Sequence, residues 1–193
     1  GFPTYVAGLI MAAYFAGLVA GTVWSRPIIQ RVGHIRAFAA AAALISATAL
    51  LHAFEVSAVL WIVLRVVTGF SFAAIYLVVE SWLNARATNA SRGAILSIYM
   101  IASYMAIGLG QFLLMVDTPT SFRLFALASM LFSLGMIPIA LTRAEAPDIE
   151  PIPAIGPRQL YRISPVSMIG CLIAGFVSGG IYGMGPVYAQ GVM

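Results

Sequence analysis

Two ionisable residues, Arg65 and Glu80, lie within one long apolar stretch that covers residues 57–83. A stretch of about 20 apolar residues is long enough to cross a bilayer as a helix. A charge at membrane depth is costly, and it usually faces a water-filled path or a buried partner. With a rise of about 1.5 Å per residue, the two lie roughly 22 Å apart and cannot pair with each other. The pattern therefore indicates a polar path through a membrane.

Further side chains are candidates to line this path. Because successive helical residues are about 100° apart, one face of the stretch carries Arg65, Gly69, Phe72, Tyr76 and Glu80. The stretch 94–116 adds Tyr104 and Gln111 as candidates. Two alternatives stay open. Arg65 could cap a neighbouring helix or pair with a carboxylate elsewhere, and polar side chains in bundles often only hydrogen-bond between helices.

The composition indicates that the elements that position these residues lie in a membrane. Hydrophobic residues make up 62% of the 193, only 8% are charged, and the mean hydropathy is +1.00. Soluble domains have about 25% charged residues. The long, unalternating apolar stretches are not those of a β-barrel. We therefore predict an all-α integral membrane protein, a helical bundle, with six transmembrane helices over residues 4–25, 36–54, 57–83, 94–116, 122–142 and 165–189.

Small residues predict close helix packing. Ala13, Gly17 and Gly21 repeat every fourth residue, which lets two helix backbones approach each other. Gly108 and Gly110 are expected to pack in the same way.

The Arg residues predict an orientation. Of the ten, eight fall in the connections 26–36, 84–93 and 143–164. On the other side of the predicted bundle there is only Arg123, at the start of the stretch 122–142. By the positive-inside rule, the three basic connections are cytoplasmic. Both ends of the chain then lie outside, and the absence of an initiator Met leads us to expect a fragment of a longer protein.

Three short motifs carry a resemblance to a known family. In order along the chain, these are Gln30-Arg-Val-Gly33-His-Ile-Arg36, Arg65-Val-Val-Thr-Gly69, and Glu80 followed by Arg92-Gly93. Their order and spacing resemble those of the major facilitator superfamily. The segment 76–84, YLVVESWLN, is most similar to the YcaD-like bacterial branch of that family. The resemblance covers essentially the whole chain.

The resemblance implies an organisation of the chain. Residues 1–143 would be the N-terminal transporter half without its first helix (helices 2–6 of twelve), 144–164 the central cytoplasmic linker, and 165–193 helix 7. It also implies a cytoplasmic gate, a charge network formed by Gln30, Arg31, Gly33, Arg36, Glu80 and Arg92. The family usually has an acidic residue where Gln30 stands, so the gate would depend on Glu80 with Arg31 or Arg92.

The function implied is secondary active transport of a small solute across the bacterial inner membrane by alternating access, coupled to a proton or cation gradient. The protein would be multi-pass, monomeric at full length, in contact with lipid, and without nucleic acid or cofactor. Two alternatives remain: a scaffold or sensor with a transporter-like fold, and an intramembrane enzyme. An enzyme would need a nucleophile with a base, or a metal cluster. We identify no histidine at membrane depth, no metal site and no catalytic residues, so we expect no enzyme.

Overall fold

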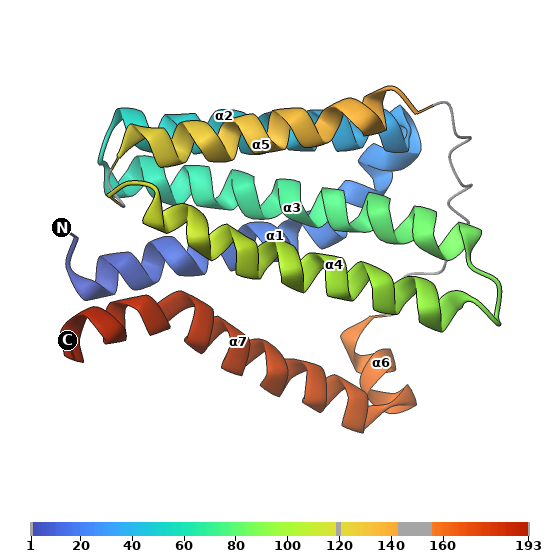
Figure 1. Cartoon of the computed structure of the whole chain (residues 1–193). Helices are drawn as coiled ribbons and strands as arrows, with labels where there is room; N and C mark the ends of the chain where they lie inside the picture. The colour runs from blue at the N-terminus through green and yellow to red at the C-terminus, as the bar shows by residue number, and fades with distance from the viewer. Residues whose placement is uncertain (1, 119–120, 143–155, 193) are drawn as a thin grey trace. The chain divides into compact units, whose positions relative to one another are not determined.

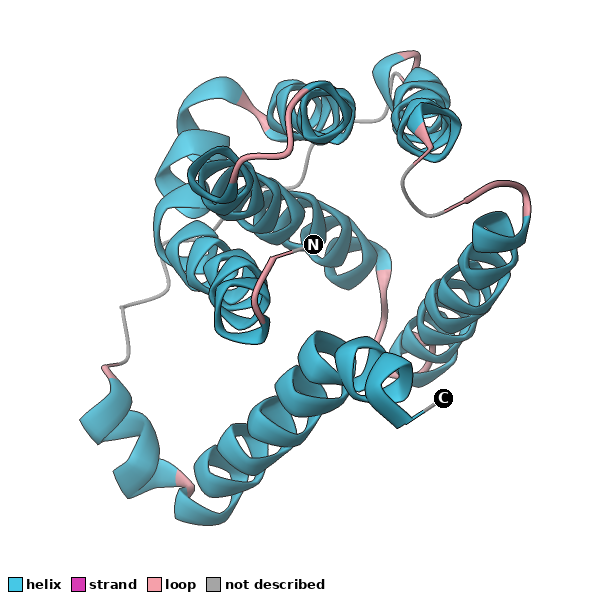
Figure 2. Cartoon of the chain, turned by 90° about the vertical axis from the view of Figure 1, so that its left-hand side faces the viewer, coloured by secondary structure: helices cyan, strands magenta, loops and turns pink. Residues whose placement is uncertain are grey.

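The computed structural model describes residues 2–118, 121–142 and 156–192. This part of the chain is helices and connections without a β-strand, which confirms the all-α prediction (Figure 2). The elements are α1 (Thr4–Val32), α2 (His34–Phe54), α3 (Ala58–Arg86), α4 (Arg92–Phe112), the 3-10 turn η1 (Leu113–Met115), α5 (Phe122–Ala140), α6 (Pro157–Ile163) and α7 (Pro165–Val192). All of these helices except α6 are long and apolar enough to cross a membrane, as predicted.

The chain divides into two compact units. One comprises residues 13–149, and the other comprises residues 1–12 and 150–193. In the larger unit, α2 packs against both α3 and α5, and α2 and α5 run side by side (Figure 1). The Ser46 hydroxyl of α2 joins these two helices, lying 2.7 Å from Ser129 Oγ and 3.0 Å from Ser133 Oγ of α5. Such hydroxyl bonds hold helices together where water is excluded.

The predicted glycine contact joins α1 to α3. A Cβ added at Gly17 would collide with the Val66 carbonyl, and one at Gly69 would collide with the Tyr14 carbonyl. At Gly21, it would lie 2.7 Å from the Phe70 oxygen. The two backbones therefore touch, and only glycine fits. The same expectation for Gly108 and Gly110 is wrong, because a Cβ at either would meet nothing within 4 Å.

The first basic connection is much shorter than predicted. Instead of a loop over 26–36, α1 continues through Pro27 to Val32, and α2 begins at His34. An interior proline costs a helix about 3 kcal/mol, but the turn after it is held by Ile29, which is 1% exposed and packs with Ala37 and Val78. Gly33 alone reverses the chain, with a φ of 89° that favours glycine.

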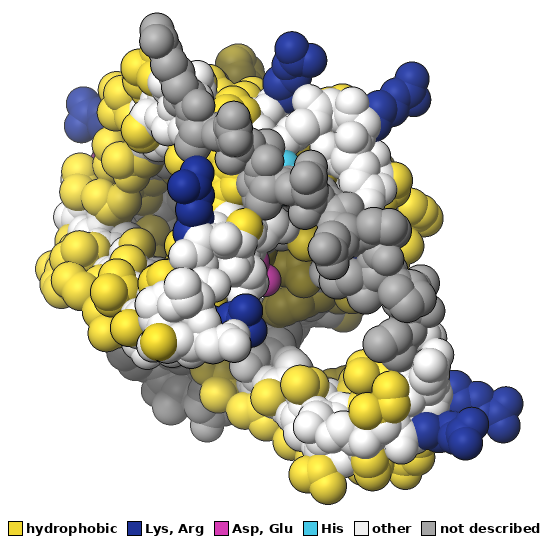
Figure 3. All heavy atoms as spheres, turned by 90° about the vertical axis from the view of Figure 1, so that its right-hand side faces the viewer, with side chains coloured by type: hydrophobic (Ala, Val, Ile, Leu, Met, Phe, Trp, Pro, Cys, Tyr) yellow, Lys and Arg dark blue, Asp and Glu magenta, His cyan; other side chains and the backbone are white. Residues whose placement is uncertain are grey.

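The other basic connections are also partly helical. Between α3 and α4, the connection is residues 87–91 rather than 84–93. Figure 3 views the ends of the helices where α1 meets α2 and α3 meets α4, and Arg side chains, in dark blue, project there.

The smaller unit contains the first turns of α1 together with α6 and α7. Gly183 of α7 is buried, and a Cβ there would lie 3.8 Å from Met11 Cβ. Helix α6 carries Arg158 and Arg162 within the predicted linker 144–164. Most of that linker, residues 144–155, lies outside the described residues.

Candidate functional site

A partly open cavity of about 190 Å³ lies in the larger unit, between α2, α3 and α5. It is lined by Ile45, Thr48, Ala49, His52, Arg65, Thr68, Phe72, Phe125 and Phe132. The α3 residues Arg65, Thr68 and Phe72 follow the helical repeat, which turns all three towards α2 and α5. One wall is therefore polar and cationic, and the rest is apolar and largely aromatic.

Arg65 supplies the charge in the cavity. Its Nε is buried and forms no hydrogen bond with a described residue. The ion pair found in the described part of the chain is elsewhere, between Asp117 and Arg123. Electrostatically, Arg65 interacts with Tyr14 of α1 and with His52 of α2. A guanidinium with no ion pair to a described residue can bind an electron-rich partner.

His52 faces Arg65 from α2 and is 7% exposed. Its Nδ1 lies 2.6 Å from the Thr48 carbonyl oxygen. A carbonyl only accepts, so Nδ1 carries the proton, and Nε2 of the neutral ring is an acceptor. Nε2 is buried without a hydrogen-bond partner among the described residues. His52 is thus buried in the last turn of α2, within the stretch 36–54 that was predicted to span the membrane.

Two threonines complete the polar wall. The Thr48 and Thr68 hydroxyls lie 3.0 Å apart, which joins α2 to α3. Each can also bond a carbonyl of its own helix: Thr48 at 3.0 Å from Ile45 O, and Thr68 at 2.7 Å from Leu64 O. Because each hydroxyl has a single proton, one of them donates to the other and the second donates to its own carbonyl. Neither proton is then left for the cavity, to which the hydroxyls offer acceptor lone pairs.

Aromatic rings form the apolar wall. Phe72 meets Phe132 edge to face, with ring centroids 5.6 Å apart. Phe125 stacks on His52, with centroids 6.5 Å apart and planes 8° apart. Aromatic pairs of these kinds fix ring positions, so the cavity has defined walls.

The predicted cavity residues separate into three groups. Arg65 and Phe72 line the cavity. Gly69 is buried at the contact with α1, where its lack of a side chain serves packing. Tyr76, Tyr104 and Gln111 do not line this cavity and are exposed in the structure.

The family profile described as Major Facilitator Superfamily matches residues 1–193. The chain belongs to the major facilitator superfamily. The part of the chain that the structure describes has six helices long and apolar enough to cross a membrane, so it is a multi-pass membrane protein.

Curated relatives give a second comparison. The chain is 29% identical over 190 residues to the "Uncharacterized MFS-type transporter YcaD" of Salmonella enteritidis PT4, covering 97% of this chain and 50% of the relative. With YcaD of Escherichia fergusonii, the identity is 29% over 188 residues, covering 96% and 49%. The chain thus spans about half the length of the curated relatives it matches. No solved structure matches it.

The superfamily motif residues lie near the helix ends. Gln30, Arg31, Arg36, Glu80 and Arg92 are exposed. Among the described residues, Glu80 forms no ion pair with Arg31 or Arg92, so the expected network is not assembled here. Of the motif glycines, Gly33 makes the α1–α2 turn.

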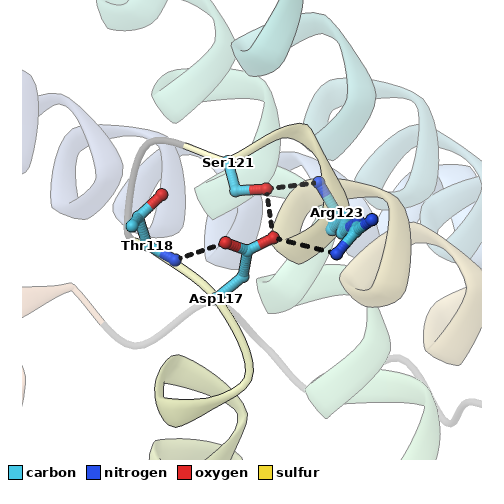
Figure 4. A network of polar contacts seen from close by, with 4 residues as sticks. All are labelled: Asp117, Thr118, Ser121 and Arg123. Atoms are coloured by element: carbon cyan, nitrogen blue, oxygen red, sulfur yellow. Dashed lines mark hydrogen bonds and ion pairs between the residues drawn. The ribbon is translucent and has the colours of Figure 1, made fainter.

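An ordered polar network lies on the opposite, predicted outer side, between α4 and α5 (Figure 4). Asp117 accepts hydrogen bonds from the Thr118 backbone and the Ser121 hydroxyl, both at 2.7 Å. The hydrogen bond from Ser121, which has the larger effect, and the bond from Thr118 both lower the pKa of the Asp117 carboxyl. Ser121 Oγ accepts from Arg123 N at 3.2 Å, which caps α5. The network is a helix cap and a turn, not a binding site.

Sequence reasoning missed most of the cavity. His52, Thr48, Thr68, Phe125 and Phe132 are lining residues that were not candidates. His52 was detectable, because a histidine four residues after a threonine in an apolar stretch departs from the apolar pattern. The phenylalanines gave no signal, since aromatic residues on a membrane helix are common.

Proposed function

We propose that this chain works within a secondary active transporter that carries a small solute across the bacterial inner membrane by alternating access, driven by an ion gradient. In this proposal, residues 1–143 belong to the N-terminal half, 144–164 to the central linker and 165–193 to the start of the second half. The basic connections face the cytoplasm. The full-length protein is monomeric.

The observation that carries the proposal is the guanidinium of Arg65, which lines a cavity inside a bundle of apolar helices without a described counter-ion. A protein retains an unpaired charge at this depth at a cost of several kcal/mol. Membership of a superfamily whose curated relatives are named transporters supports the same conclusion.

In the proposal, the exposed faces of α3 and α4 line the permeation path. Tyr76 is 43% exposed and Tyr104 is 61% exposed, and Gln111 is exposed one residue before the end of α4. Gln30, Arg31, Arg36, Glu80 and Arg92, with Gly33 as their hinge, act as the cytoplasmic gate. Glu80 then pairs with Arg31 or Arg92 only when the path is closed on that side, a change of state typical of alternating access.

Cysteine labelling from both sides of the membrane tests alternating access. Tyr76→Cys is made in a Cys171→Ser background, because Cys171 is exposed. An impermeant maleimide should label it in right-side-out and in inverted vesicles, because the path opens to each side in turn. Ile137→Cys, on the exposed face of α5, is the control and should react from neither side.

Labelling of Tyr76→Cys from one side only, under every condition, would contradict the proposal and favour a scaffold or sensor that uses this fold without moving a solute. Gly69 is unsuitable as a second probe, because a side chain there meets the Tyr14 carbonyl.

A further inference from the structure

The cavity between α2, α3 and α5 has polar groups that point to a particular class of occupant. It holds one permanent cation, Arg65, and no carboxylate is among its lining residues. A guanidinium binds a carboxylate through charge-assisted hydrogen bonds, often two in parallel. The occupant should therefore present an anionic carboxylate to Arg65.

The remaining polar atoms are acceptors. His52 Nε2 has no partner among the described residues. The single protons of the Thr48 and Thr68 hydroxyls are used in the bond between them and in a bond to Ile45 O or Leu64 O. A second carboxylate would meet only lone pairs here. A hydroxyl on the occupant, in contrast, donates to His52 Nε2 and satisfies it.

The apolar wall sets the size and body of the occupant. Phe72, Phe125 and Phe132 cover it with ring faces and edges. The volume of about 190 Å³ is somewhat larger than the roughly 150 Å³ of an apolar cavity that holds benzene. It is smaller than the roughly 300 Å³ at which pockets for drug-sized ligands begin. One ring or a short branched chain fits, together with a carboxylate.

We infer that this cavity binds a small hydroxycarboxylate with an apolar body. Arg65 holds the carboxylate, His52 accepts from the hydroxyl, and the three phenylalanines enclose the body. The statement that this molecule is the transported solute rests on the function proposed above; the statement that it binds does not.

Three ligands with the same phenyl group test the inference by equilibrium dialysis against the full-length protein in lipid nanodiscs. Mandelate carries both polar groups, mandelamide lacks the charge, and phenylacetate lacks the hydroxyl. Mandelate should bind at least about 10-fold more tightly than mandelamide, since a charge-assisted bond contributes about 1.5–3 kcal/mol. It should bind about 2- to 10-fold more tightly than phenylacetate, because one neutral hydrogen bond is lost.

Variants assign each preference to its residue. Arg65→Gln should remove the preference for mandelate over mandelamide. His52→Phe should remove the preference for mandelate over phenylacetate. Arg86→Gln, at an exposed position in the last turn of α3 and outside both the cavity and the proposed gate, should leave both preferences unchanged.

If a variant fails to fold, the ranking on the unaltered protein still decides. Equal binding of mandelate and mandelamide, or no saturable binding below about 10 mM, overturns the inference. Binding without mandelate flux in proteoliposomes contradicts transport of this class and leaves the site intact. If the protein transports other solutes but does not bind mandelate, the inferred binding site is overturned and the proposed transport function still stands.

Discussion

Arg65 carries a full charge into a cavity walled by three helices, with its Nε unpaired among the described residues. Because the proposal assigns this charge to binding rather than folding, we expect Arg65→Met to raise the free energy of unfolding by about 1–4 kcal/mol, as when apolar side chains replace buried ions. Thermal unfolding in detergent, without ligand, measures this change. Arg36→Met is the control, since Arg36 is exposed and its replacement should change little.

A loss of stability in Arg65→Met would contradict this account. It would show that the guanidinium has a structural partner, such as a helix end or a carboxylate, which is the alternative that the sequence leaves open.

Asp117 supports the α4–α5 connection through its ionised form. Two hydrogen bonds hold its pKa below the usual 3.8. The folded state therefore prefers the carboxylate, so the stabilisation is complete above the unfolded pKa and is lost as the pH falls through the folded pKa. Asp117→Asn should lower the Tm at pH 7. The difference in Tm between the variant and the unaltered protein should become smaller towards pH 3.

Glu55→Gln is the matched control, since Glu55 is an exposed carboxylate on another connection. A deficit of Asp117→Asn that stays the same at pH 7 and pH 3 would show that shape, not charge, makes the cap.

At this scale the sequence predicts part of the cavity. Arg65 and Phe72 were accessible because they lie on one helix, where a period of 3.6 residues places them together. Gly69 shares that period, yet it faces α1, because a face of about 100° is wide enough to meet two neighbours. His52, Phe125 and Phe132 join the cavity from other helices, and the relative rotation of helices depends on packing that no single stretch encodes.

At the scale of the elements, α1 and α3 approach each other through Gly17, Gly21 and Gly69. Gly69→Ala places a methyl group against the Tyr14 carbonyl, and overpacking of this kind costs about 1–3 kcal/mol. We therefore expect a lower Tm for Gly69→Ala.

Gly108→Ala is the control for helix propensity, because a Cβ there meets nothing within 4 Å. It should raise the Tm slightly or leave it unchanged. Equal effects at the two sites would show that α1 and α3 do not touch at Gly69.

Helix ends were the least predictable feature of the elements. A span was expected to end at residue 25, before Arg26-Pro27, since proline usually marks a boundary. Helix α1 nevertheless continues to Val32, because Ile29 is buried against Ala37 and Val78. A tertiary contact outweighs a local signal here.

At the scale of the whole molecule, composition alone gives the all-α membrane class, and six apolar stretches give the six long helices. The Arg distribution also predicts an orientation. In a Cys171→Ser background, an impermeant maleimide should label Thr88→Cys only in inverted vesicles, because the α3–α4 connection faces the cytoplasm. Val56→Cys, in the exposed α2–α3 connection, should react only in right-side-out vesicles. The reverse pattern would overturn the orientation and the placing of the gate.

The central claim is that the Arg65 side chain faces an aqueous solute site and not lipid. Its most direct test is the reaction of Arg65→Cys, in a Cys171→Ser background, with a small charged methanethiosulfonate in nanodiscs. Leu51→Cys is the control, since Leu51 precedes the cavity residue His52 and is 44% exposed. The account predicts that Arg65→Cys reacts, that Leu51→Cys does not, and that mandelate slows the reaction. An unreactive Arg65→Cys, or equal reaction at both positions, would contradict it.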